Sequence, residues 1–68
     1  MKSLTGKEFI KLLKKKGWEL ARIRGSHHVY TKPGKIERIS VPVHGNKPLK
    51  KGLQNFLMKI AEISDVEL

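Results

Sequence analysis

The fold is decided by the stretch of residues 18–43, which reads WELARIRGSHHVYTKPGKIERISVPV. Over residues 18–24, strand-forming residues alternate with charged ones, and a second strand-like run follows over residues 28–31. Alternation with a period of two is typical of a half-buried strand, and the Gly25-Ser26 pair between the two runs indicates a hairpin.

A third strand follows a tight turn. The segment Lys32-Pro33-Gly34-Lys35 has Pro and Gly at the positions that a type II turn requires. After this turn, Ile39, Val41 and Val43 fall on one face of a strand, because successive side chains alternate between faces. The middle of the chain therefore predicts a three-stranded antiparallel meander.

A helix is predicted on each side of this meander. The first covers about residues 5–16, because Thr5 and Glu8 have the spacing of a capping box and the apolar residues and lysines that follow take opposite faces. The second has Pro48 in its first turn and carries an apolar stripe formed by Leu49, Leu53, Phe56, Leu57 and Ile60.

The order α-β-β-β-α predicts an α+β fold in which two helices lie on one face of a three-stranded antiparallel sheet, as in double-stranded-RNA-binding domains. Ser64 and Glu67 repeat the capping-box spacing and predict one more helical turn. A chain of this length is expected to form one domain, residues 1–68.

The composition narrows the class of partner. Fifteen Lys and Arg residues against six Asp and Glu residues give a net charge of +9, which favours nucleic acid, anionic lipid or an acidic protein. The absence of Cys excludes disulfides, thiolate nucleophiles and cysteine-ligated zinc. No signal-peptide pattern and no apolar run of about 20 residues is present, so we expect a cytoplasmic protein with no membrane partner.

Three groups of residues are candidates for function. Lys47, Lys50 and Lys51 mark the start of the second predicted helix, where free N–H groups and the helix dipole favour a phosphate; a solvated basic helix start is the alternative. The hairpin turn gathers Arg22, Arg24, Gly25, Ser26, His27, His28 and Tyr30. His44 follows the last strand, either as a second proton carrier or as a loop histidine bonded to the backbone.

The two adjacent histidines point to opposite faces of their strand. Alternation puts His28 on the side of Tyr30 and His27 on the other side, without deciding which side faces the helices. One of the two rings is therefore a candidate for partial burial, with a packing role as the alternative to catalysis.

Cleavage of RNA is a chemistry that these residue types can perform. RNA carries its own nucleophile, the 2′-hydroxyl, so the enzyme needs only a base, an acid and cations that stabilise the phosphorane; histidine and Lys or Arg supply these. A metal-dependent nuclease needs clustered carboxylates, and the acidic residues here are scattered or near the end of the chain. A zinc site of His27, His28 and His44 lacks a fourth ligand. We therefore expect neither a metal nor another cofactor.

The whole chain resembles the HicA toxins of HicA–HicB toxin–antitoxin pairs. The resemblance rests on Lys16-Gly17-Trp18, Gly25-Ser26-His27 followed by His28-Val29-Tyr30, Val41-Pro42-Val43-His44 and Leu49-Lys50-Lys51-Gly52. It implies a double-stranded-RNA-binding-like fold, mRNA cleavage, His27 as the catalytic residue and neutralisation by a HicB-like antitoxin. His28 occupies a position that varies in the family.

The leading hypothesis is a metal-independent endoribonuclease toxin that cleaves mRNA with His27 as general base or acid. RNA contacts are expected from Arg22, Arg24, Ser26, His28, Tyr30, His44, Lys47, Lys50 and Lys51, with Tyr30 as a stacking or packing residue. The free protein is expected to be a monomer that forms a hetero-oligomer with its antitoxin. The alternatives are a non-catalytic RNA-binding module of the same fold and a protein whose basic face docks on an acidic partner.

Overall fold

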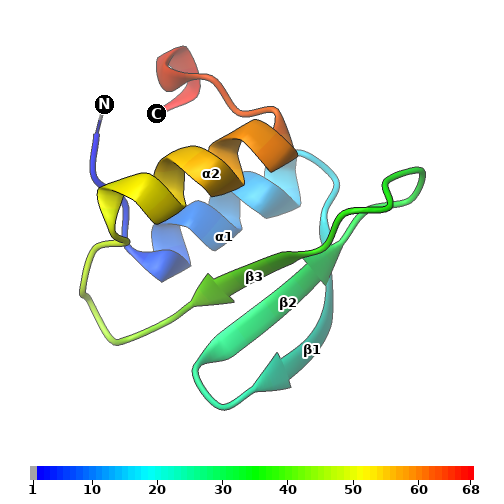
Figure 1. Cartoon of the computed structure of the whole chain (residues 1–68), viewed down its shortest axis with the longest axis horizontal. Helices are drawn as coiled ribbons and strands as arrows, with labels where there is room; N and C mark the ends of the chain where they lie inside the picture. The colour runs from blue at the N-terminus through cyan, green and yellow to red at the C-terminus, as the bar shows by residue number, and fades with distance from the viewer. Residues whose placement is uncertain (1) are drawn as a thin grey trace.

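A computed structural model describes residues 2–68 and confirms the predicted α+β architecture. Its elements are α1 (Gly6–Lys15), β1 (Glu19–Arg24), β2 (His27–Thr31), β3 (Ile39–Pro42), α2 (Lys51–Ala61) and the short 3-10 helix η1 (Asp65–Glu67). The strands form one antiparallel sheet in the order β1-β2-β3, and both helices lie on the same side of it (Figure 1). Within the described range, no helix is long and apolar enough to cross a lipid bilayer.

The strand register decides which side chains face the helices. Tyr30 pairs with Ile39, and His28 pairs with Val41. Tyr30, Ile39 and Val41 are buried in the core, and paired residues share a face, so His28 lies on the helix-facing side of the sheet. His27 therefore points to the opposite side, which no helix covers and which we call the open face.

The helices cover the sheet unevenly. Both pack against β3, and β1 is the strand farthest from them (Figure 1). The pairing of β1 with β2 shifts between Leu20 and Arg22, which leaves Leu20 and Ile23 on the helix-facing side. These two side chains are 47% and 54% exposed, because no helix lies over them.

α1 follows the prediction closely. The Thr5 hydroxyl accepts a hydrogen bond from the Glu8 N–H (3.2 Å), and the Glu8 carboxylate accepts one from the Thr5 N–H (2.9 Å), which completes the predicted capping box. Gly17 follows the helix with a φ of 91°, a conformation that favours glycine. Phe9 and Leu13 are fully buried, and the lysines of the helix lie on its outer side.

The prediction for the second helix was wrong in its start and in part of its buried face. Pro48 lies outside α2 and forms a β-bridge with Thr5, while the Leu49 N–H donates to the Leu4 carbonyl (2.7 Å). These contacts keep the chain extended up to Lys50, so the helix begins at Lys51. The buried helical residues are Gln54, Leu57, Met58 and Ala61, whereas Phe56 of the predicted stripe is 60% exposed.

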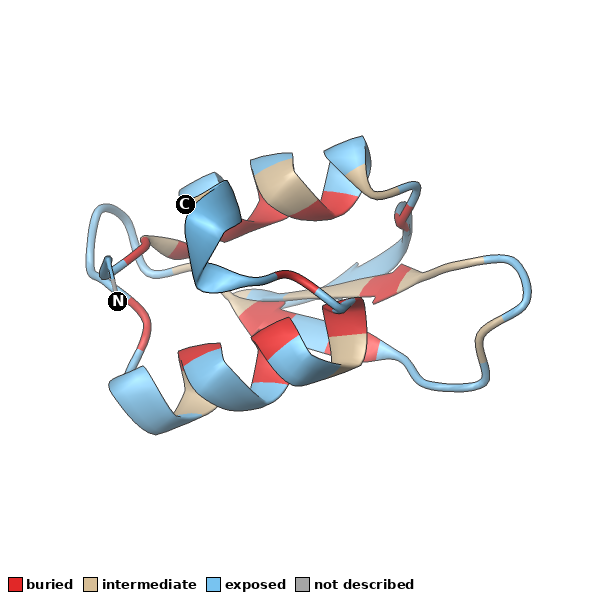
Figure 2. Cartoon of the chain, turned by 90° about the horizontal axis from the view of Figure 1, so that it is seen from above, coloured by how far each residue is buried: buried red, intermediate tan, exposed pale blue. Residues whose placement is uncertain are grey.

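Gln54 accounts for this orientation of α2. Its side chain is 1% exposed, its Oε1 accepts a hydrogen bond from the Leu4 N–H (3.0 Å), and its Nε2 donates to the Lys2 carbonyl (2.7 Å). Figure 2 shows the resulting pattern, with buried residues along the inner sides of both helices and exposed residues outside. One amide thus satisfies two backbone groups of the N-terminal segment.

The first turn of α1 approaches the end of β3 very closely. Gly6 is buried there, and a Cβ atom at this position would lie 2.4 Å from the carbonyl oxygen of Pro42 and 3.2 Å from a methyl carbon of Val43. A backbone carbonyl has little freedom to move away. Only glycine therefore allows α1 to pack at this distance.

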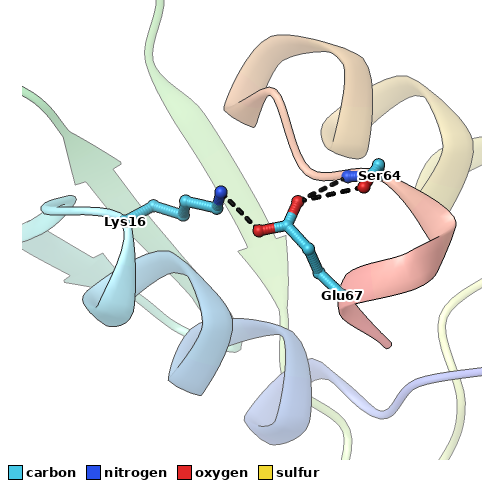
Figure 3. A network of polar contacts seen from close by, with 3 residues as sticks. All are labelled: Lys16, Ser64 and Glu67. Carbon is cyan, nitrogen blue, oxygen red and sulfur yellow. Dashed lines mark hydrogen bonds and ion pairs between the residues drawn. The ribbon is translucent and has the colours of Figure 1, made fainter.

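The predicted final turn is present as η1, and it docks back onto α1. Glu67 accepts hydrogen bonds from the N–H of Ser64 (2.7 Å) and from its hydroxyl (3.3 Å), and it forms an ion pair with Lys16 (Figure 3). A second ion pair joins Lys35 to Glu62 (2.7 Å). These contacts hold the segment after α2 against the rest of the chain.

Substitution of Gly6 tests the close approach of α1 to β3. We expect Gly6→Ala to lower the free energy of unfolding by about 1–3 kcal/mol, because the added methyl group forces α1 and β3 apart. Urea denaturation measures this. Gly52→Ala is the matched control: a Cβ at Gly52 meets no atom within 4 Å, and this helical position gains up to about 1 kcal/mol from alanine. Equal effects of the two substitutions would contradict the packing argument.

Substitution of Gln54 tests the amide contacts. Gln54→Leu keeps the volume but leaves the buried Leu4 N–H without a partner, so we expect a loss of about 1–3 kcal/mol in the free energy of unfolding. Asn55→Leu, at the exposed neighbouring position, should change it by less than about 0.5 kcal/mol. A Gln54→Leu protein as stable as the parent would show that the amide contributes nothing.

The pH dependence of stability tests the contacts of Glu67. The hydrogen bond and ion pair from Lys16, followed by the Ser64 N–H, lower the pKa of this carboxyl from its ordinary value of 4.5. A lowered folded-state pKa means that the stabilisation is present above the unfolded-state value and is lost as the pH falls through the folded-state value. We therefore expect Glu67→Gln to lower Tm at neutral pH and to converge with the parent in acid. Lys16→Gln should reduce the same pH dependence; an unchanged dependence in both variants would contradict the assignment.

Candidate functional site

The open face of the sheet carries an imidazole beside two guanidinium groups. His27 is the first residue of β2, one position earlier than predicted, and Arg24 of β1 is its direct partner across the hairpin. Arg22 lies two residues along β1, on the same face, opposite Val29. All three side chains are exposed, so an extended polyanion has access to them at the same time.

Ser40 is a member of this face that sequence reasoning missed. Its Oγ lies 3.4 Å from Nδ1 of His27, a long hydrogen-bond distance. This contact engages Nδ1, while Nε2 has no hydrogen-bond partner within residues 2–68. The signal was available: Ile39 and Val41 were predicted on one face of the third strand, which places Ser40 on the other.

Of the remaining residues of the hairpin cluster, His28 and Tyr30 lie on the side of the sheet opposite His27. Ser26 is half-buried in the turn, and its carbonyl accepts a hydrogen bond from the Val43 N–H (2.7 Å), which ties the hairpin to the chain just after β3. His28 is half-buried on the helix-facing side. Tyr30 is 2% exposed, and this burial raises the pKa of its phenol. The expectation that Tyr30 contacts RNA was therefore wrong in its stacking form, since its ring packs in the core.

The predicted lysines belong to a second feature, a surface hollow next to the end of β3. Its lining residues are Pro42, His44, Lys47, Pro48, Leu49, Lys50 and Leu53. Lys50 is the N-cap residue of α2. Lys47 lies in the loop before α2, so the expectation that Lys47 stands at the helix start was wrong. Lys51 is the first residue of α2 but does not line the hollow.

Pro42 connects the open face to the hollow. It pairs with His27 in the sheet and also lines the hollow, so the two features border one another at this end of β3. His44 is exposed two residues further on. The structure thus brings six of the predicted site residues into two adjacent groups: His27, Arg22 and Arg24 in one, and His44, Lys47 and Lys50 in the other.

Glu19 lies on the open face at the far end of β1, opposite Thr31, and the acidic side chains with assigned contacts lie outside both groups. Glu8 caps α1, and Glu62 and Glu67 form ion pairs with lysines. The side-chain hydrogen bond from Lys35 is the main cause that lowers the pKa of Glu62. Over residues 2–68, no three His, Asp or Glu side chains come together as a metal-ion site would require.

Comparison with protein families matches residues 6–63 to the family described as HicA toxin of bacterial toxin-antitoxin. The matched range includes both α-helices and all three strands, and therefore the open face and the hollow. No curated protein matches the chain.

Proposed function

The chain belongs to the HicA family of toxins from bacterial toxin–antitoxin systems, and on that premise we propose that it is an endoribonuclease that cleaves mRNA without a metal ion. The observation that carries the proposal is the position of His27. Its ring is exposed on the open face, directly across from Arg24 and in contact with Ser40. A proton carrier and a phosphate-binding cation thus stand side by side, as metal-independent cleavage of RNA requires.

In the proposed reaction, Nε2 of His27 removes the proton from a ribose 2′-hydroxyl. The 2′-oxygen attacks the adjacent phosphorus, the bond from phosphorus to the 5′-oxygen breaks, and the departing oxygen takes up a proton. The products are a 2′,3′-cyclic phosphate and a 5′-hydroxyl. Arg24 and Arg22 stabilise the negative charge on the phosphorane, and Ser40 holds the ring of His27 through Nδ1.

We propose His44 as the source of the proton for the departing oxygen. It is exposed in the loop after β3, near Pro42, which is the ladder partner of His27. A second histidine on the far side of the scissile phosphate completes an acid–base pair, because one ring removes a proton while the other donates one.

The wider proposal follows from the charge and the family. We propose that residues 1–68 act as one RNA-binding and ribonuclease domain, monomeric when free and active in the cytoplasm. With a net charge of +9 the protein attracts RNA of any sequence, so a cell needs a means of control. A HicB-like antitoxin that covers the open face would form a hetero-oligomer and keep RNA away from His27.

Substitution of His27 tests the proposal. We expect the purified protein to cleave single-stranded RNA in the presence of EDTA and to leave 2′,3′-cyclic phosphate ends. His27→Ala should cleave at least about 100-fold more slowly, since the proton carrier is lost, and should bind RNA as well as the parent. Gel analysis of labelled RNA measures the rate, and filter binding measures the affinity.

Thr31→Ala is the matched control, because Thr31 lies on the same strand and the same face at the end opposite His27. It should cleave like the parent. A His27→Ala protein that cleaves as fast as the parent would refute the catalytic assignment. A parent protein that binds RNA in a salt-sensitive way without cutting it would instead support the non-catalytic RNA-binding module.

A further inference from the structure

We propose that the hollow next to the end of β3 is a subsite for one unpaired nucleotide of the RNA, adjacent to the nucleotide that is cleaved. The inference rests on the proposed function, and it adds a recognition element to it. Such a subsite requires a single-stranded RNA substrate, because a base that remains paired cannot enter the hollow.

The lining of the hollow matches the two parts of a nucleotide. Its floor and walls are apolar and come from Pro42, Pro48, Leu49 and Leu53. Apolar side chains accept a base that has left its stack, as in enzymes that hold single bases in a pocket. Lys47 and Lys50 stand at the same hollow and supply point charges for a phosphate.

The charges of these two lysines are available to a ligand. The ion pairs formed within residues 2–68 use Lys16 and Lys35 and leave Lys47 and Lys50 without a carboxylate partner. No acidic residue lines the hollow. A phosphate that enters therefore meets two exposed cations and no competing anion.

The hollow is preformed by backbone hydrogen bonds along the loop that builds it. The Val43 N–H donates to the Ser26 carbonyl (2.7 Å), and the Lys47 N–H donates to the His44 carbonyl (3.1 Å). At the other end, the Leu49 N–H donates to the Leu4 carbonyl (2.7 Å), which Gln54 positions through the Leu4 N–H. A loop held at these points loses little conformational entropy when a ligand binds.

The hollow also lies at the right place along the RNA. Pro42 lines it and pairs with His27, and paired residues in an antiparallel ladder have Cα atoms about 4.5–5.5 Å apart. The hollow therefore begins directly across the ladder from His27. A ribose held at His27 therefore places its neighbour over the hollow.

Binding of an uncleavable RNA tests the lysines. The probe is a fluorescent single-stranded oligomer in which every ribose is 2′-O-methylated, so that no nucleophile is present. For Lys47→Gln/Lys50→Gln, we expect weaker binding and a salt dependence of log K that is less steep by about one for each lysine removed. The matched control is Lys14→Gln/Lys59→Gln, which loses the same charge at exposed positions outside the hollow and should keep the slope of the parent.

A series of single-stranded RNA oligomers that each lack one base tests the apolar lining of the hollow. In the parent, removal of the base at one particular position should weaken binding by about tenfold, because the apolar contact between that base and the hollow is lost. Leu53→Gln should abolish this penalty. A duplex of the same sequence should bind the parent less tightly than the single strand and should be insensitive to Leu53→Gln. Circular dichroism of each variant checks that the fold is retained.

The outcomes separate this inference from the proposed function. The subsite is refuted if the two double variants bind alike and no single base matters, whether or not the parent cleaves RNA. If the lysine and base effects appear but unmodified RNA stays intact with the parent protein, the endoribonuclease proposal fails and the hollow stands as an RNA-binding site. Equal affinity for the duplex would refute the requirement for an unpaired nucleotide.

Discussion

The side-chain amide of Gln54 is the interaction on which most of this structure depends. It joins the N-terminal segment to α2 across about fifty positions of sequence, because it bonds the backbone of both Lys2 and Leu4. Leu4 in turn accepts the N–H of Leu49, which keeps the chain extended before α2 and delays the start of the helix. Together with the buried apolar residues of α2, this polar group therefore helps to fix the orientation of the helix and the course of the loop that lines the hollow.

Local signals in the sequence were sufficient for the parts of the fold that depend on neighbouring residues. The capping boxes at Thr5 and Ser64 and the turn at Lys32–Lys35 form as predicted. The start and buried face of α2 did not follow from local signals, because Pro48 and Leu49 bond to residues far away in the sequence. A polar residue such as Gln54 also gives no hydrophobic signal, although it is among the most buried side chains.

The candidate site, like the fold, was predictable from the sequence only in part. Composition placed His27, His28 and the two arginines in one candidate cluster, and the preference for His27 came from the family resemblance. The choice of face needed the register with β3, where Tyr30 meets Ile39 in the core. The sequence left Tyr30 as either a stacking or a packing residue, because the two look alike in a sequence, and its burial in the core agrees with packing. The hollow was beyond prediction, because its walls combine a strand end, a loop and a helix start that come together only in the folded chain.

The position of β1 at the edge of the sheet bears on whether two copies of this chain can pair through their strands. Its outer edge offers unpaired backbone groups, and its half-exposed Leu20 and Ile23 add apolar surface beside them. Such an edge invites another strand to pair with it, and charged residues are a common defence. Arg22 and Arg24 stand on this strand, so the side chains that we propose grip RNA also discourage self-association. A substitution that removes the charge of Arg22 or Arg24, made so that a host cell tolerates the protein, therefore carries a risk of aggregation.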